Sequence, residues 1–377
     1  MENISDLFPS TYEASRERFR LYLNVVRKHW PKAVLSQQRL KSNKDLTIDW
    51  IQSNALEKNE KVLIITTAEH GIEGYVGSAM LELFIEQYLN QLDPANTGLL
   101  LVHTINPWGM KHHRRTNTNN VDLNRNFVYQ TTDLDPDYNP ASKEIDAILH
   151  PRQPLGSYFW SHIPFLLQVF RYSLKMGLKN FRSISLLGQY HNPQGIHYGG
   201  KSIQEETLAV MEFYREAFKG YQQILLLDMH TGHGPRYQMS LVNSVFETGK
   251  SQEFEKRFNF PLVVAANPEE FYDLRGDMID YIYTLKQIEF PHKRLYAVSF
   301  EFGTYGDSNL AALRSMRTML FENRAYCQGA TKSKNRARAA RALGEMFAPK
   351  ENVWRIKAVE DGNRAFEGIL KAEGYIH

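Results

Sequence analysis

Three side chains in this sequence have the types and spacing of a zinc site. His70 and Glu73 lie three residues apart, directly after an apolar run, and His230 ends a second such run. Zinc accepts imidazole nitrogen and carboxylate oxygen, and a catalytic site keeps a fourth position open. His-x-x-Glu is also common by chance, as a surface histidine beside a glutamate that opens a helix. The sequence predicts one metal ion at His70, Glu73 and His230, with His233 as a rival ligand.

A polar segment rich in arginine and asparagine follows the first motif. It contains Arg114, Arg115, Asn117, Asn124 and Arg125. A guanidinium group binds planar anions in a bidentate manner and keeps its charge. These residues could therefore bind a carboxylate and a developing oxyanion. The alternative is a polar loop whose arginines pair with neighbouring acids.

Glu301 follows another apolar run, residues 296–300. A carboxylate at the end of a buried strand is costly unless it has a partner or a function. Glu301 is therefore a candidate general base, although nearby arginines or backbone N–H groups could equally satisfy it. Asp122, Asp228 and His233 leave room for a second metal ion without requiring one.

Apolar runs and segments of helical periodicity alternate along the chain and must position these side chains. Buried strands are predicted at residues 61–67, 98–105, 223–229 and 296–300, and amphipathic helices at residues 12–30 and 75–89. Continuous apolar strands separated by helices favour an α/β fold, an α/β/α sandwich with a mixed, mostly parallel twisted sheet. The polar motifs follow the strands, where such folds bind their ligands.

Length and composition indicate a globular chain. It has 377 residues, of which 42% are hydrophobic and 23% charged. We expect a single catalytic domain over residues 1–377, with an insertion at about residues 131–200 and a helical tail from about residue 331. The tail begins with a basic run that is typical of a solvated helix face. The formal net charge of +3 is too small to indicate a nucleic-acid partner.

The chain carries one cysteine, Cys327, so a disulfide within the chain and a cysteine zinc site are excluded. Its first residues are acidic, where a signal peptide would be basic. No apolar run approaches the length of a membrane helix. These observations predict a cytoplasmic location and no membrane partner.

The motifs, taken in order, resemble the zinc carboxypeptidase family. The order is His-x-x-Glu, arginine, Asn-Arg, histidine, tyrosine and glutamate, and the Asn-Pro-x-Gly segment that begins at Asn106 is similar too. The nearest resemblance is to an uncharacterised branch known as a domain of unknown function. It covers about residues 61–304. The resemblance implies a carboxypeptidase-like fold and one Zn²⁺ per chain.

The resemblance also implies a role for individual residues. The zinc ligands would be His70, Glu73 and His230. The catalytic residues would be Glu301 as general base, Arg115 at the carbonyl oxygen and Tyr272 as a mobile tyrosine. The substrate-binding residues would be Asn124 and Arg125, which hold a terminal carboxylate, and Ile279, which selects the terminal side chain.

The function implied is a zinc-dependent hydrolase, a metallopeptidase that cleaves a peptide or amide bond next to a free carboxylate with metal-activated water. The expected partner is a peptide or an acylated amino acid, and the sequence gives no oligomeric state. One alternative is an N-acyl amino acid deacylase on the same scaffold. Another is a non-catalytic protein that binds a peptide end, against which Glu301 argues, because a binding protein gains nothing from a buried base.

Overall fold

A twisted sheet forms the centre of the molecule. The structure, a computed structural model, describes residues 4–264 and 274–377. Within these residues the sheet has eight strands in the order β1-β2-β4-β3-β5-β8-β6-β7. Their bounds are β1 Val34–Arg39, β2 Thr47–Ser53, β3 Lys61–Thr67, β4 Thr97–Val102, β5 Gln223–Thr231, β6 Met239–Asn243, β7 Val263–Val264 and β8 Arg294–Phe302.

The four central strands, β4, β3, β5 and β8, run parallel to one another. The pairs β1–β2, β2–β4 and β6–β8 are antiparallel. The predicted mixed sheet with a parallel centre is therefore confirmed. All four predicted strands belong to this centre, because buried parallel strands have the continuous apolar sequences that are easiest to recognise.

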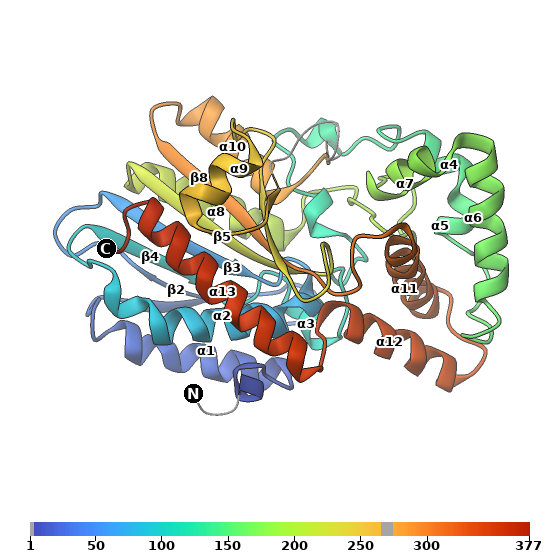
Figure 1. Cartoon of the computed structure of the whole chain (residues 1–377), viewed down its shortest axis with the longest axis horizontal. Helices are drawn as coiled ribbons and strands as arrows, with labels where there is room; N and C mark the ends of the chain where they lie inside the picture. Colours follow the sequence, from blue (N-terminus) through green and yellow to red (C-terminus); the bar gives the residue numbers. More distant parts are fainter. Residues whose placement is uncertain (1–3, 265–273) are drawn as a thin grey trace.

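Helices cover both faces of the sheet (Figure 1). Their bounds are α1 Tyr12–Val26, α2 Gly74–Gln87, α3 Pro107–Lys111, α4 Ala141–Glu144, α5 Asp146–Leu149, α6 His162–Met176, α7 Leu178–Leu186, α8 Glu205–Gly220, α9 Ser251–Phe258, α10 Met278–Glu289, α11 Asn309–Cys327, α12 Ser333–Phe347 and α13 Asn352–Ala372. Helix α1 ends at Val26, before the predicted residue 30. Pro31 disfavours helical backbone at Trp30, whose ring remains buried and donates a hydrogen bond from Nε1 to the Thr97 carbonyl (2.8 Å).

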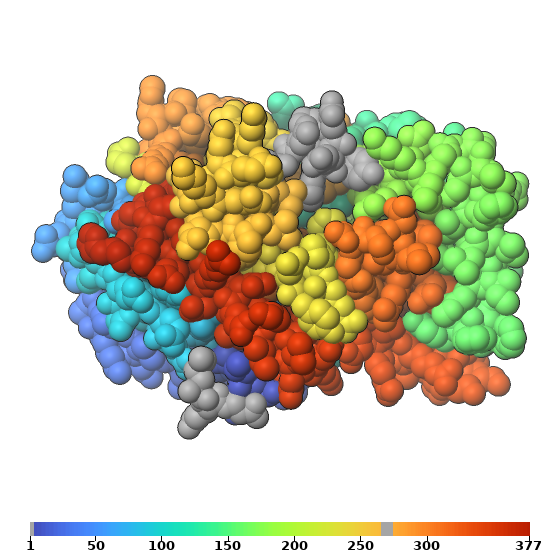
Figure 2. Space-filling view, in the orientation of Figure 1, coloured from blue at the N-terminus to red at the C-terminus, as the bar shows by residue number. Residues whose placement is uncertain are grey.

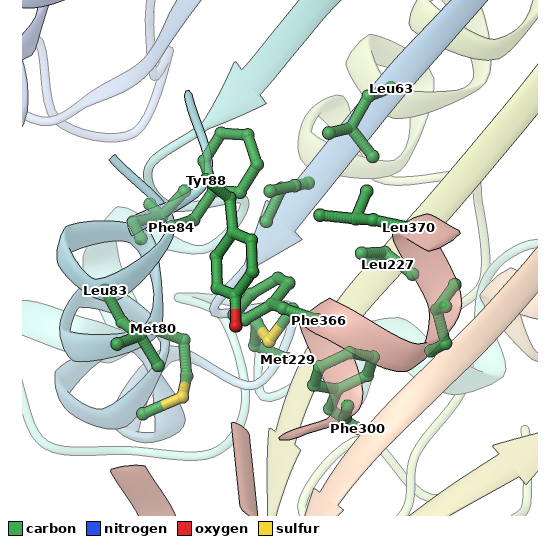
Figure 3. Close-up of a cluster of buried hydrophobic side chains, with 14 of the residues drawn as sticks. Leu63, Met80, Leu83, Phe84, Tyr88, Leu227, Met229, Phe300, Phe366 and Leu370 are labelled. Atoms are coloured by element: carbon green, nitrogen blue, oxygen red, sulfur yellow. The ribbon is translucent and has the colours of Figure 1, made fainter. Parts of the chain in front are cut away.

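Strand β3 shows how the sheet separates two hydrophobic cores. Leu63 and Ile65 point to one face, which α1, α2, α9 and α13 cover. Val62 and Ile64 point to the other face, which α8 and α10 cover. Figure 3 shows part of the first core, where Phe366 of α13 lies among side chains from α2, β5 and β8. A sheet buried on both faces holds the ends of its strands rigidly, and these ends carry the polar motifs.

Helices α4 to α7, from the region predicted as an insertion, lie with α11 and α12 at one end of the long axis of the molecule (Figures 1 and 2). They enclose a third hydrophobic cluster, in which Phe165 and Phe181 pack with Phe321 of α11. This helical end adjoins the carboxyl ends of the central strands. Among the described helices, none has the length and apolar character needed to cross a membrane.

Candidate active site

Three predicted site residues lie at the ends of adjacent parallel strands. His70 follows β3, His230 is the penultimate residue of β5, and Glu301 is the penultimate residue of β8. His230 and Glu301 are register partners across β5 and β8. The short 3₁₀ helix Gly71–Glu73 then directs Glu73 back toward the same strand ends. Parallel strands thus bring together residues separated by more than 200 positions in the sequence.

Glu73 joins the two histidine rings. Its Oε1 lies 3.0 Å from His70 Nδ1, and its Oε2 lies 3.1 Å from His230 Nδ1. The backbone N–H of Thr231 also donates to Oε2 at 2.9 Å. Burial alone would raise the pKa of the Glu73 carboxyl, but the charges and hydrogen bonds of His70 and His230 lower this pKa to about 2. Glu73 is therefore held as a carboxylate between the two rings.

An aspartate orients each histidine from its other ring nitrogen. His70 Nε2 lies 3.0 Å from Asp122 Oδ1, and His230 Nε2 bonds to Asp228 Oδ2. Asp228 is itself fixed by the Thr66 hydroxyl, which donates to it at 2.6 Å. A carboxylate on one ring nitrogen sets the tautomer and leaves the other nitrogen as a lone-pair donor, an arrangement common around metal sites.

The donors at this centre fit a metal ion. Glu69, His70 and His230 each offer a ligand atom, and these atoms lie within 4.8 Å of one another. Neither carboxylate oxygen of the fully buried Glu69 has a hydrogen-bond partner, although its Oε2 forms an ion pair with His230 Nε2 at 3.5 Å. Burial raises the pKa of this carboxyl well above its ordinary value, although the charge of His230 opposes the shift. A buried carboxyl without hydrogen bonds is costly, and a bound cation would satisfy it.

Glu69 and Glu73 thus compete for the role of carboxylate ligand. Glu69 completes the compact group of three ligand atoms. Glu73 contacts the Nδ1 atoms of both histidines. The histidine contacts favour Glu73 as the ligand. In each ring the other nitrogen, Nε2, is bound to an aspartate, which leaves the Nδ1 atom beside Glu73 to face a metal ion.

Arg115 lies in the same cluster of buried side chains and lines the cavity with His70 and His230. Its guanidinium pairs with Asp122 at 3.1 Å and reaches Glu73 at 3.4 Å. His197 Nδ1 lies 3.0 Å from the same oxygen of Asp122, Oδ2, whereas His70 contacts Oδ1. Burial alone would raise the pKa of Asp122, yet Arg115, His70 and His197 hold it well below its ordinary value. One buried aspartate therefore fixes a candidate metal ligand and the candidate oxyanion-binding arginine together.

Glu301 lines the cavity at this centre, and its Oε2 is buried without a hydrogen-bond partner. Burial raises the pKa of Glu301 to about 7, although the charge of His230 acts in the opposite direction. A carboxyl group with a pKa near neutrality can both accept and return a proton at physiological pH. The position and environment of Glu301 suit the predicted general base.

Asn124 and Arg125 also line the cavity, but both already have protein partners. Asn124 donates to Asp277 Oδ2 at 2.9 Å and accepts from the Met278 N–H at 2.8 Å. Arg125 donates to the carbonyls of Asn124 (2.7 Å) and Leu186 (2.9 Å), while its Nε is buried without a partner. These contacts fix the guanidinium at the cavity wall.

Glycine is required where Arg125 passes the insertion. Gly188 has a φ of +86°, and a Cβ atom there would lie 2.8 Å from Arg125 Cδ. A side chain at this position would displace the arginine. The backbone just after α7 therefore packs directly against the side chain of Arg125.

The remaining predicted residues are placed as follows. Ile279 lies in the first turn of α10 and packs in the hydrophobic core, and it is not among the residues that line the cavity. Tyr272 lies outside the described residues. His233 lines the cavity but lies outside the compact group of ligand atoms.

A cavity of about 380 Å³ opens over the strand ends. Its floor is polar and includes His70, His230 and Glu301, whereas its walls are largely apolar and come from α7, α11 and α12. The apolar wall includes Leu178, Phe181, Leu313, Met316, Met346 and Phe347. A small molecule with a polar end and an apolar end would fit such a space.

Sequence reasoning missed two residues of this site. Glu69 directly precedes His70, and an acid next to a candidate ligand was the signal that could have revealed it. Arg182 of α7 lines the cavity with its Nε unpartnered, and its charge lowers the pKa of His233, for which burial is the larger cause. No pattern around Arg182 indicated that α7 would cover the strand ends.

Several solved structures are similar to this chain at low identity. Bovine thrombin-activatable fibrinolysis inhibitor, in complex with tick carboxypeptidase inhibitor, is 13% identical with a TM-score of 0.46, and the match covers 87% of this chain and 95% of that one. Carboxypeptidase A from Helicoverpa armigera is 14% identical with a TM-score of 0.45, covering 89% and 74%. Metallo-carboxypeptidase from Burkholderia cenocepacia is 14% identical with a TM-score of 0.39, covering 92% and 69%.

A search of curated proteins found no match. A family model described as "Protein of unknown function (DUF2817)" matches residues 8–361, which is nearly the whole chain. The chain belongs to this family.

Proposed function

We propose that the protein is a zinc-dependent hydrolase that cleaves a peptide or amide bond next to a free carboxylate. The observation that carries the proposal is the meeting of His70, His230 and Glu301 at three adjacent strand ends, with Glu73 between the two histidine rings. Two imidazoles and a carboxylate are a catalytic zinc donor set.

His70, His230 and Glu73 would hold the ion, with Glu69 as a further carboxylate beside it. A zinc ion bound there would polarise the substrate carbonyl and lower the pKa of water. The pairs His70–Asp122 and His230–Asp228 keep both imidazoles oriented toward the centre. The apolar walls of the cavity would restrict the entry of water. Electrostatic interactions within the cavity would then be stronger, because the local dielectric constant is lower.

Glu301 would accept a proton from water and return it to the leaving amine. Its carboxylate is near the histidines, and its pKa of about 7, raised by burial, allows both steps near neutral pH. Arg115 would stabilise negative charge on the carbonyl oxygen, since it lies within the same cluster of side chains. Arg125, and Asn124 beside it, would orient the substrate carboxylate.

The size and walls of the cavity favour a small substrate with an apolar group. A volume of about 380 Å³ fits a dipeptide or an acylated amino acid better than a long peptide. This keeps N-acyl amino acid deacylation as a second candidate function. Both reactions use the same zinc ligands and the same base.

The test is a substrate screen with purified, zinc-loaded protein. Release of an amino acid from N-blocked dipeptides with a free carboxylate would support the peptidase. Activity restricted to N-acetyl amino acids would favour the deacylase. Binding of these compounds without turnover, at any pH near neutrality, would contradict both and leave a peptide-binding protein.

A further inference from the structure

Helix α6 carries apolar side chains on two opposite faces. One face packs into the helical end of the molecule through Phe165 and Val169. The other face is open to solvent and consists of Ile163, Leu167, Phe170 and Leu174, and Phe159 and Trp160 of the preceding turn extend it; the exposed fractions of these six side chains are 51% to 72%. We call these six residues the apolar stripe. A helix that is apolar all round is normally buried on all sides.

The apolar stripe is one continuous surface. Its four members within the helix recur at steps of four and three residues, so they share one side of α6, and Leu166, 51% exposed, lies at the edge of this side. Helix α6 lies at the outer end of the long axis of the molecule, where it is drawn in green in Figures 1 and 2. The stripe is therefore able to meet an extended, flat partner.

A basic surface adjoins the start of the stripe. The first nine residues of α12 and the residue before it expose five cations and no acid, Lys332, Lys334, Arg336, Arg338 and Arg341, of which Lys334, Arg338 and Arg341 share one side of the helix. We call these five residues the basic face. The two segments are joined by hydrogen bonds from Leu155 N to Gly329 O (2.9 Å), Thr331 N to Leu155 O (2.9 Å) and Tyr158 N to Asn335 Oδ1 (3.3 Å). These bonds hold the start of α12 against the segment that leads into Phe159 and Trp160.

The segment that carries the stripe is basic. Residues 147–204 contain three lysines and three arginines but no aspartate or glutamate. The acids that flank this region are Glu144, which pairs with Lys175 at 2.6 Å, Asp146, which lies 3.7 Å from His191 Nε2, Glu205 at the start of α8, and Glu345 near the end of α12. An anionic partner would meet little repulsion at this end of the molecule.

We propose that the protein docks on an anionic lipid surface through the apolar stripe and the basic face. Tryptophan and phenylalanine insert readily at the level of lipid headgroups, and lysine and arginine attract anionic lipids. The docked molecule lies on the bilayer and does not span it. This replaces the sequence-based expectation of no membrane partner, because the sequence could not show which face of α6 is left uncovered.

A second copy of the chain fits the same surface less well. Two apolar stripes in contact would bring two basic faces close together, and like charges across an interface are unfavourable. An anionic bilayer satisfies both surfaces at once. The proposal does not depend on the hydrolase activity.

The test is co-sedimentation of the full chain with vesicles. Vesicles of phosphatidylcholine containing phosphatidylglycerol should retain the protein at low salt, and pure phosphatidylcholine should retain about tenfold less. Leu167→Glu with Phe170→Glu should lower retention on the anionic vesicles by about tenfold or more. Lys334→Glu with Arg338→Glu should lower it comparably while the apolar stripe is intact. Ile288→Glu on α10, another exposed apolar position, is the matched control and should bind as the wild type does.

Two results would overturn the proposal. One is equal retention of wild type and both double variants on anionic vesicles. The other is a lipid-free dimer in sedimentation velocity that Leu167→Glu with Phe170→Glu converts to a monomer, which would assign the stripe to self-association. Quenching of Trp160 fluorescence by brominated lipid supplies a second reading, since Trp160→Phe should remove the quenched component but keep binding.

Discussion

His230 on β5 and Glu301 on β8 are register partners on neighbouring parallel strands, 71 positions apart in the sequence. This pairing places a candidate metal ligand beside a candidate general base without any flexible loop between them. Sites built on strands are held more precisely than sites on loops. The distance between the two groups is therefore set by the sheet.

Replacing Glu301 with glutamine should separate metal binding from turnover. Glu301→Gln keeps the size of the side chain but removes the proton acceptor, so kcat should fall by about 10²–10⁴-fold. Metal content should stay at the wild-type level, because Glu301 is not among the proposed ligands. Hydrolysis rates and elemental analysis on the same preparation measure both. Retained turnover would remove Glu301 from the role of base, and loss of metal would make it a ligand.

Asp122 should control metal affinity without binding the metal. Asp122→Asn weakens the hold on His70 and removes the charge that fixes Arg115. Loss of such an orienting carboxylate typically weakens metal binding by about 10–100-fold. Competition with a chromophoric chelator measures the affinity. Asp137→Asn, an exposed aspartate paired with Lys143, is the control and should leave the affinity unchanged.

Arg125 should act on substrates that carry a free carboxylate. Arg125→Ala should raise KM for an N-blocked dipeptide by about tenfold or more, since a charged hydrogen bond to the substrate is lost. The C-terminal amide of the same dipeptide, a poorer substrate, should change little. Arg152→Ala, which removes an exposed arginine, is the matched control and should leave KM unchanged. An equal effect on acid and amide would show that Arg125 acts only through its bonds to the Leu186 carbonyl and the cavity wall.

Glu206 should make stability depend on pH. Burial raises its folded-state pKa to about 7, even though Asn117 donates hydrogen bonds to it at 3.3 Å. Between about pH 4.5 and pH 7, Glu206 therefore keeps its proton in the folded state, whereas it has lost this proton in the unfolded state. The contribution is fully present below the unfolded pKa and is lost as pH rises through the folded pKa.

Denaturant unfolding at pH 5.5 and pH 8, as approximate end points, measures this effect. Between the two conditions, the free energy of unfolding of the wild type should fall by on the order of 1–3 kcal/mol more than that of Glu206→Gln. Glu212→Gln, on the exposed side of α8, should behave as the wild type. A Glu206→Gln variant with the same pH dependence as the wild type would show that Glu206 is ionised throughout.

The central strands and the polar residues at their ends were predictable from the sequence. Strand β3 has the predicted bounds Lys61–Thr67, because its run of buried β-branched and apolar residues is unbroken. The edge strands were not predicted. Strand β1, Val34–Arg39, is polar and has no buried residue. It is a strand because it pairs with β2, and its own sequence does not show the pattern of a buried strand.

The contacts among the site residues were less predictable than their identity. Sequence order indicated His70, Glu73 and His230, but the bridging of both rings by Glu73 depends on tertiary placement. Glu69 was missed because an ionisable residue beside a ligand motif is normally exposed, whereas here it is fully buried. Helix α6 lies in the region predicted only as an insertion, and the sequence did not indicate which of its faces the rest of the chain would leave open.

The most direct test of the account is metal content, measured by elemental analysis on the wild type, on His70→Ala and on Asp137→Asn. We expect about one zinc per chain in the wild type and in the surface variant, and loss of the zinc in His70→Ala. A wild type that takes up no zinc after reconstitution would contradict the proposed catalytic centre. Full zinc content in His70→Ala would contradict the proposed ligand set.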